Sequence, residues 1–70
     1  MESMMPKTVA KQLAADPSVG TEELEAAVHY MSEKLIEAAL LNAPAPFLTY
    51  RNKLIFETTL RIRRRRQSSI

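Results

Sequence analysis

The chain has 70 residues, of which 46% are hydrophobic and 26% are charged, with no cysteine and a formal net charge of +2. A chain this short forms one domain at most, and its stability is marginal unless close helix packing, a partner or self-association adds to it. The lack of cysteine excludes disulfides, zinc sites with cysteine ligands and thiol nucleophiles.

The first segment predicts a short helix that begins at Pro6. Proline suits the first helical position, Val9 and Leu13 are spaced for one helix face, and Pro17 stops the run. A helix of about ten residues is unstable alone, so we expect it to dock on another element. Glu2 precedes every basic residue and no long apolar run follows, so we expect no signal peptide, no membrane span and a cytoplasmic location.

Residues 21–42 predict a second helix of roughly six turns. Thr21 is a suitable N-cap, and the acids that follow it favour the positive end of the helix dipole. The apolar residues at helical spacing are Leu24, Val28, Met31 and Leu35. The last two turns are apolar nearly all the way round, which predicts burial on every side.

Residues 46–66 fit either a helix or a strand. As a helix they place one set of residues on a shared face: Phe47, Tyr50, Leu54, Ile55, Thr58 and Ile62. As a strand they alternate apolar with charged residues. The length matches the preceding helix and prolines mark a short connection, which favours an antiparallel hairpin. We therefore predict a single all-α domain over residues 1–70, a short helix followed by a helical hairpin; the alternative is an α+β fold with a C-terminal strand or ribbon.

The charges are distributed unevenly along the chain. Residues 1–50 hold three lysines and seven acids, a balance of −4, whereas residues 51–70 hold seven basic residues and one acid, a balance of +6. The basic end, residues 61–70, contains what we call the arginine cluster: Arg61, Arg63, Arg64, Arg65 and Arg66. Three uses of this cluster are open: binding nucleic-acid phosphates, binding an acidic protein surface, and pairing with Glu22, Glu23 and Glu25 in the hairpin.

A second candidate surface is the apolar hairpin tip, residues 36–48. Its candidate interface residues are Ile36, Leu40, Leu41 and Phe47. A chain of this size cannot cover so much apolar surface with one short helix, and exposed apolar patches usually mark binding sites. We therefore expect self-association or a protein partner at the tip.

The sequence contains no catalytic motif and no metal-ligand spacing. His29 is the sole histidine, and although Glu25 and Glu33 lie one turn on either side of it, one helix supplies only a shallow, water-filled cluster. We therefore expect no enzyme activity, no cofactor and no metal.

The sequence predicts a small accessory or regulatory protein that binds nucleic acid or a nucleoprotein through its arginines, with a viral or mobile-element source suggested by size alone. The alternative is a structural or inhibitory protein-interaction module whose arginines contact an acidic surface.

Overall fold

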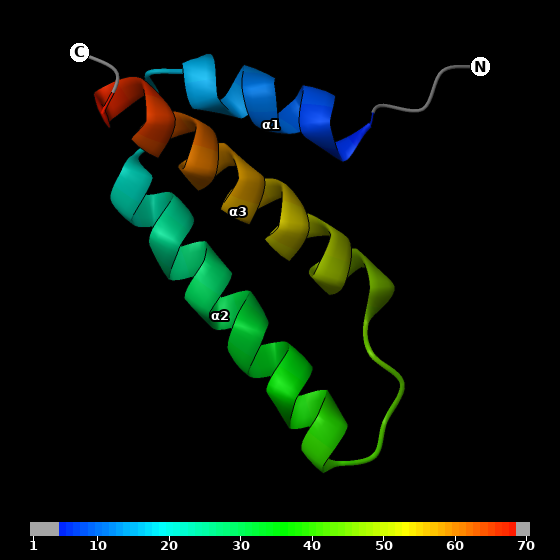
Figure 1. Cartoon of the computed structure of the whole chain (residues 1–70). Helices are drawn as coiled ribbons and strands as arrows, with labels where there is room; N and C mark the ends of the chain where they lie inside the picture. Colours follow the sequence, from blue (N-terminus) through cyan, green and yellow to red (C-terminus); the bar gives the residue numbers. More distant parts are fainter. Residues whose placement is uncertain (1–4, 69–70) are drawn as a thin grey trace.

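The computed structural model describes residues 5–68, which form three helices. These are α1 (Pro6–Ala15), α2 (Thr21–Leu40) and α3 (Phe47–Ser68). α3 lies in the middle, with α1 on one side and the antiparallel α2 on the other (Figure 1). The predicted all-α fold, a short helix followed by a helical hairpin, is confirmed. Residues 5–68 contain no strand, so the α+β alternative is not supported.

α1 docks on α3 through small side chains. Pro6 occupies the first turn, as predicted, and the helix ends at Ala15, just before Pro17. Ala10 and Thr59 are both fully buried, and the Thr59 Oγ1 lies 3.4 Å from the Ala10 carbonyl oxygen and 2.8 Å from that of Ile55. Because neither side chain is large, the two helix backbones approach closely at this point.

The N-cap of α2 lies one residue before the one that the sequence suggested. Gly20, not Thr21, is the N-cap, and its N–H donates to the Glu23 Oε1 at 3.0 Å. This is the half of a capping box that the glutamate supplies, and it leaves the Thr21 hydroxyl for another partner. The predicted inner face is confirmed, since Leu24 is buried and Val28, Met31 and Leu35 are half-buried.

Asn42 ends α2 in the left-handed conformation, with φ of 58°. The Ala43 N–H donates to the Ala38 carbonyl at 2.8 Å and the Asn42 N–H to the Ala39 carbonyl at 3.1 Å. This pair of bonds is a Schellman motif, which satisfies carbonyls that the helix itself leaves unpaired. The chain then passes through Pro44 and Pro46 into α3, with the Pro46 carbonyl accepting the Tyr50 N–H at 3.0 Å.

The face that α3 buries differs from the face predicted for it. Phe47 and Tyr50 were expected to face the partner helix but are exposed, whereas Leu60, outside the expected face, is 5% exposed. The reason is that α3 is covered from two sides rather than one. The spacing of Ile55 and Thr59 turns one face to α1, and Leu60 lies on the side that meets α2.

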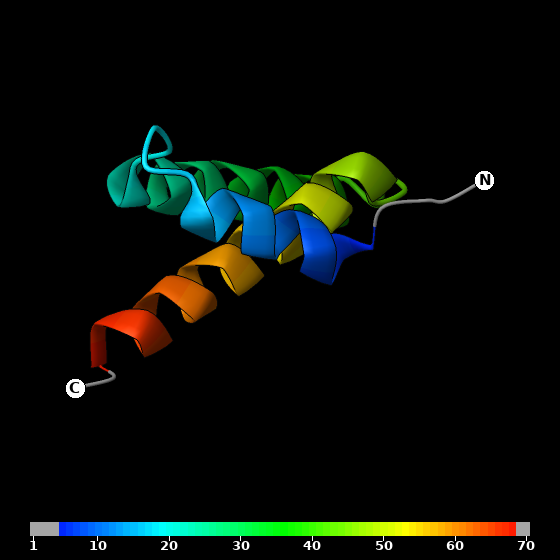
Figure 2. The same ribbon diagram turned by 90° about the horizontal axis from the view of Figure 1, so that it is seen from above.

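The last turns of α3 extend away from both neighbouring helices. Seen from above, this end of α3 separates from α1 and from the start of α2 (Figure 2). The arginine cluster runs into this projecting end, with Arg65 and Arg66 in its last turns, at the opposite end of the hairpin from the tip. The two candidate surfaces are therefore well separated on a molecule 45 Å in its longest dimension.

Candidate functional site

Arg63 is the member of the arginine cluster that the fold itself uses. Its side chain is half-buried and reaches the C-terminal end of α1. Nε donates to the Ala14 carbonyl at 3.3 Å, and Nη2 donates to the carbonyls of Leu13 and Asp16, each at 3.0 Å. Nη1 donates to the Thr21 hydroxyl at 3.0 Å. One guanidinium thus joins α3 to the end of α1 and the start of α2.

These contacts are chemically well matched. The last carbonyls of a helix have no intrahelical partner and carry the negative end of the helix dipole. A guanidinium brings a full positive charge and five N–H donors in a fixed planar arrangement, so it suits several carbonyls at once. Arg63 is therefore a structural residue, and its guanidinium is not the open phosphate contact that the sequence suggested.

The remaining arginines are exposed. Arg64 Nη2 lies 3.9 Å from the Glu25 Oε2, a loose pair between two exposed side chains. Such a pair contributes little to stability. Arg61, Arg65 and Arg66 form no hydrogen bond or ion pair with any residue in the range 5–68. The predicted pairing with the acids of α2 thus involves Glu25, while Glu23 instead caps its own helix.

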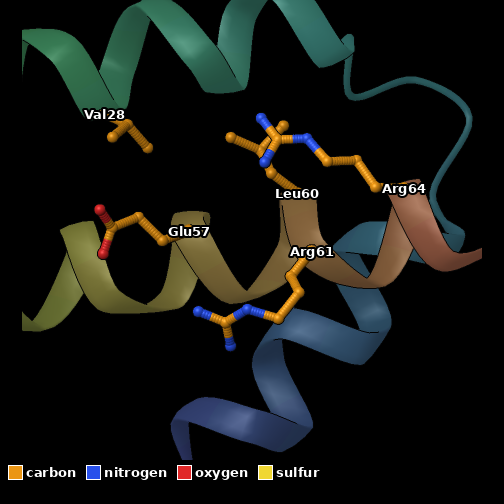
Figure 3. A pocket seen from close by; sticks show the side chains of 5 residues that line it. All are labelled: Val28, Glu57, Leu60, Arg61 and Arg64. Atoms are coloured by element: carbon orange, nitrogen blue, oxygen red, sulfur yellow. The ribbon is translucent and has the colours of Figure 1, made fainter.

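A shallow hollow of about 300 Å³ lies between α2 and α3, and we call it the α2–α3 hollow. Its lining residues are Val28, Glu57, Leu60, Arg61 and Arg64. In Figure 3, Arg64 extends over Leu60 towards α2, Glu57 extends towards Val28, and Arg61 leaves α3 in a different direction. The hollow therefore combines two cations, one carboxylate and two apolar side chains.

Asp16 lies in the turn between α1 and α2. Its Oδ1 accepts the Ser18 hydroxyl at 2.7 Å and the Ser18 N–H at 2.9 Å. These two hydrogen bonds, with a smaller contribution from the charge of Arg63, lower the pKa of the Asp16 carboxyl. The ionised form of Asp16 thus favours the turn that brings α2 back towards α3.

The predicted interface residues of the hairpin tip are all strongly exposed. The exposed fractions are 59% for Ile36, 81% for Leu40, 73% for Leu41 and 72% for Phe47. Leu48, which the sequence pattern did not single out, is 68% exposed. The three-helix arrangement leaves these side chains uncovered because α1 docks on the other half of α3, around Ala10 and Thr59.

His29 lies on the outer face of α2. Its Nε2 is 3.3 Å from the Glu33 Oε2, and both side chains are well exposed. Within residues 5–68, no three histidine, aspartate or glutamate side chains gather in a way that could hold a metal ion. The pair is thus part of a solvated helix face.

No protein-family model, curated protein or solved structure matches this chain. Among the three helices of residues 5–68, none combines the length and the apolar character needed to cross a membrane.

Proposed function

We propose that this protein is a small non-enzymatic accessory protein that binds nucleic acid through the exposed members of the arginine cluster. The observation that carries the proposal is the division of the cluster. Arg63 is committed to the fold, but Arg61, Arg65 and Arg66 are exposed and form no hydrogen bond or ion pair within the described chain. Exposed ion pairs contribute only about 0 to 1 kcal/mol each, so stability does not account for these charges.

Arginine suits phosphate for a specific physical reason. Its planar guanidinium donates two parallel N–H bonds to one phosphate and stays charged at any physiological pH. Arg65 and Arg66 are exposed, and they belong to the last turns of α3, which extend away from α1 and α2 (Figure 2). Binding of this kind is largely independent of sequence, and it weakens as salt rises because released counterions drive it.

Fluorescence anisotropy with labelled oligonucleotides tests this proposal. We expect binding to both DNA and RNA at low ionic strength, with the logarithm of the association constant falling linearly with the logarithm of salt concentration. The slope reports the number of phosphates neutralised, at about −0.9 for each in duplex DNA. Lack of binding to either nucleic acid at low salt would refute the proposal.

A second candidate function is favoured by the exposed hairpin tip. In this alternative the protein is a structural or inhibitory interaction module, which self-associates or binds a protein partner through Ile36, Leu40 and Leu41 while its arginines contact an acidic surface. An apolar interface depends little on salt, so the two candidates predict different salt responses. A pulldown from the native host, repeated at high salt, separates them.

We place both activities in the cytoplasm. The sequence has no cysteine that an oxidising compartment would pair. Fractionation of host cells, followed by detection of the protein, tests this location.

A further inference from the structure

Glu57 in the α2–α3 hollow is not explained by phosphate binding. Its side chain is 41% exposed, and its carboxylate pairs with Lys53, at 3.8 Å. That distance is too long for a hydrogen bond, and no residue in the described range donates one to this carboxylate. A surface that contacted phosphates alone would exclude a carboxylate beside Arg61 and Arg64, since it repels the ligand.

The rest of the hollow adds a small apolar surface to its charged groups. Val28 on α2 is half-buried and Leu60 on α3 is only 5% exposed, so together they give the hollow a small apolar surface, which lies beside Arg64 (Figure 3). The volume of about 300 Å³ lies at the lower end of ligand pockets, which run from roughly 300 to 1,000 Å³. Guanidinium planes also stack on nucleobases, which adds a second use for Arg64.

These features together fit one chemical class of ligand. A ligand for this hollow needs a flat apolar body, anionic groups for two arginines and hydrogen-bond donors for one carboxylate. A nucleotide has all three. Guanine offers N1–H and N2–H side by side, so its Watson–Crick edge can donate two bonds to one carboxylate, whereas the other bases present fewer donors on that edge.

We propose that the α2–α3 hollow binds an unpaired guanine nucleotide within single-stranded nucleic acid. The base lies against Val28 and the small exposed part of Leu60, Glu57 accepts its two N–H groups, and Arg61 and Arg64 contact the adjacent phosphates. Arg64 exchanges its loose pair with Glu25 for a phosphate. In a duplex the same edge of guanine is bonded to cytosine, so the proposal includes a preference for single strands. It rests on the proposed nucleic-acid function and specifies its ligand.

The test is a set of binding isotherms with short labelled strands at one fixed salt concentration. An adenine-only strand is compared with the same strand carrying one guanine, in DNA and in RNA, and with the guanine strand paired in a duplex. We expect the wild type to bind the guanine strand about fivefold to tenfold more tightly than the adenine strand, the low end of base discrimination by paired hydrogen bonds. We also expect it to bind the guanine strand more tightly than the duplex.

Glu57→Gln provides the decisive comparison. We expect this variant to lose the guanine preference while binding the adenine strand as well as, or better than, the wild type, because a repulsive charge has been removed. Glu33→Gln is the matched control, since Glu33 is exposed and does not line the hollow. It should retain the preference.

The outcomes separate the two proposals. Equal binding of guanine and adenine strands by the wild type, or a preference that survives in Glu57→Gln, overturns the guanine site and leaves the proposed function standing. No binding to any strand at low salt overturns both. A preference seen in RNA alone assigns the ligand to RNA and retains the site.

Discussion

The Nη1 of Arg63 donates to the Thr21 hydroxyl across 42 residues of sequence, at a distance of 3.0 Å. The same guanidinium holds carbonyls at the end of α1, so one side chain connects all three helices. A run of four consecutive arginines therefore contains two kinds of residue, one inside the fold and others outside it.

Arg63→Gln should destabilise the protein. The substitution removes charge-assisted hydrogen bonds and leaves the half-buried carbonyls of Leu13 and Ala14 without that donor, so we expect a cost of about 1.5 to 3 kcal/mol in the free energy of unfolding. Arg65→Gln makes the same charge change at an exposed position and should cost less than about 0.5 kcal/mol. Urea unfolding followed by circular dichroism measures both, and equal effects of the two substitutions would argue against a structural role for Arg63.

This division changes how the whole cluster should be tested. The sequence alone suggests that replacing Arg63, Arg64, Arg65 and Arg66 with glutamine would leave helix content largely intact. The contacts of Arg63 predict instead that this fourfold variant loses stability as well as charge. Functional variants should therefore keep Arg63.

Ala10→Leu should separate α1 from α3. Ala10 is fully buried beside Thr59, so extra methylene groups there force the helices apart, and overpacking of this kind typically costs about 1 to 3 kcal/mol. A short helix that is no longer docked should also lose helicity. Thermal unfolding and amide exchange measure the two effects. Ala26→Leu, at an exposed position on α2, is the control, and similar behaviour of both variants would count against the docking described for α1.

The lowered pKa of Asp16 predicts a specific dependence of stability on pH. Its contribution is fully present above the unfolded pKa of about 3.9 and is lost as pH falls through the lower folded pKa. The difference in midpoint temperature between the wild type and Asp16→Asn should therefore be largest above about pH 5 and should shrink in acid. A difference that stays constant from neutral pH into strong acid would show that ionisation of Asp16 does not stabilise the turn.

Local patterns were sufficient to predict the first two helices, whereas residues 46–66 fitted either a helix or a strand and a helix was favoured by their length and the short connection before them. Pro6, the spacing of Leu24 with Val28, and the prolines after Asn42 act within a few residues, so sequence shows them directly. The role of Arg63 was not predictable in this way, because its partners lie 42 to 50 residues away and its neighbour Arg64 is chemically identical to it.

The buried face of α3 was missed for a related reason. The prediction assumed that the third helix packs against one partner and so buries one apolar face. In the structure α3 buries two faces, since it meets α1 through Thr59 and α2 through Leu60. Thr59, at the α1 contact, is polar and so does not stand out in an apolar pattern. It can be buried because its hydroxyl donates to the Ile55 carbonyl within its own helix. The α2–α3 hollow was not visible either, because it requires Val28 and Glu57 to be brought together by the hairpin.

Leu40→Glu tests the hairpin tip. Leu40 is 81% exposed in the single chain, so its replacement should not disturb the fold but should weaken any association through the tip. We expect the wild type to sediment as more than a monomer at micromolar concentration and the variant to shift towards the monomer. A wild type that is strictly monomeric, with unchanged sedimentation in Leu40→Glu, would exclude self-association at this surface.

The most direct test of the central claim is the salt dependence of nucleic-acid binding by a triple variant, Arg61→Gln/Arg65→Gln/Arg66→Gln. This variant removes exposed charge and keeps Arg63, which the fold needs. Lys7→Gln/Lys11→Gln is the control, with positive charge removed from α1. We predict an unchanged melting transition and a log–log salt slope shallower than that of the wild type by about 2 to 3, roughly one for each phosphate that the variant no longer neutralises. The control should keep nearly the full slope. A triple variant whose slope and affinity match the wild type would contradict the assignment of these arginines to phosphate binding.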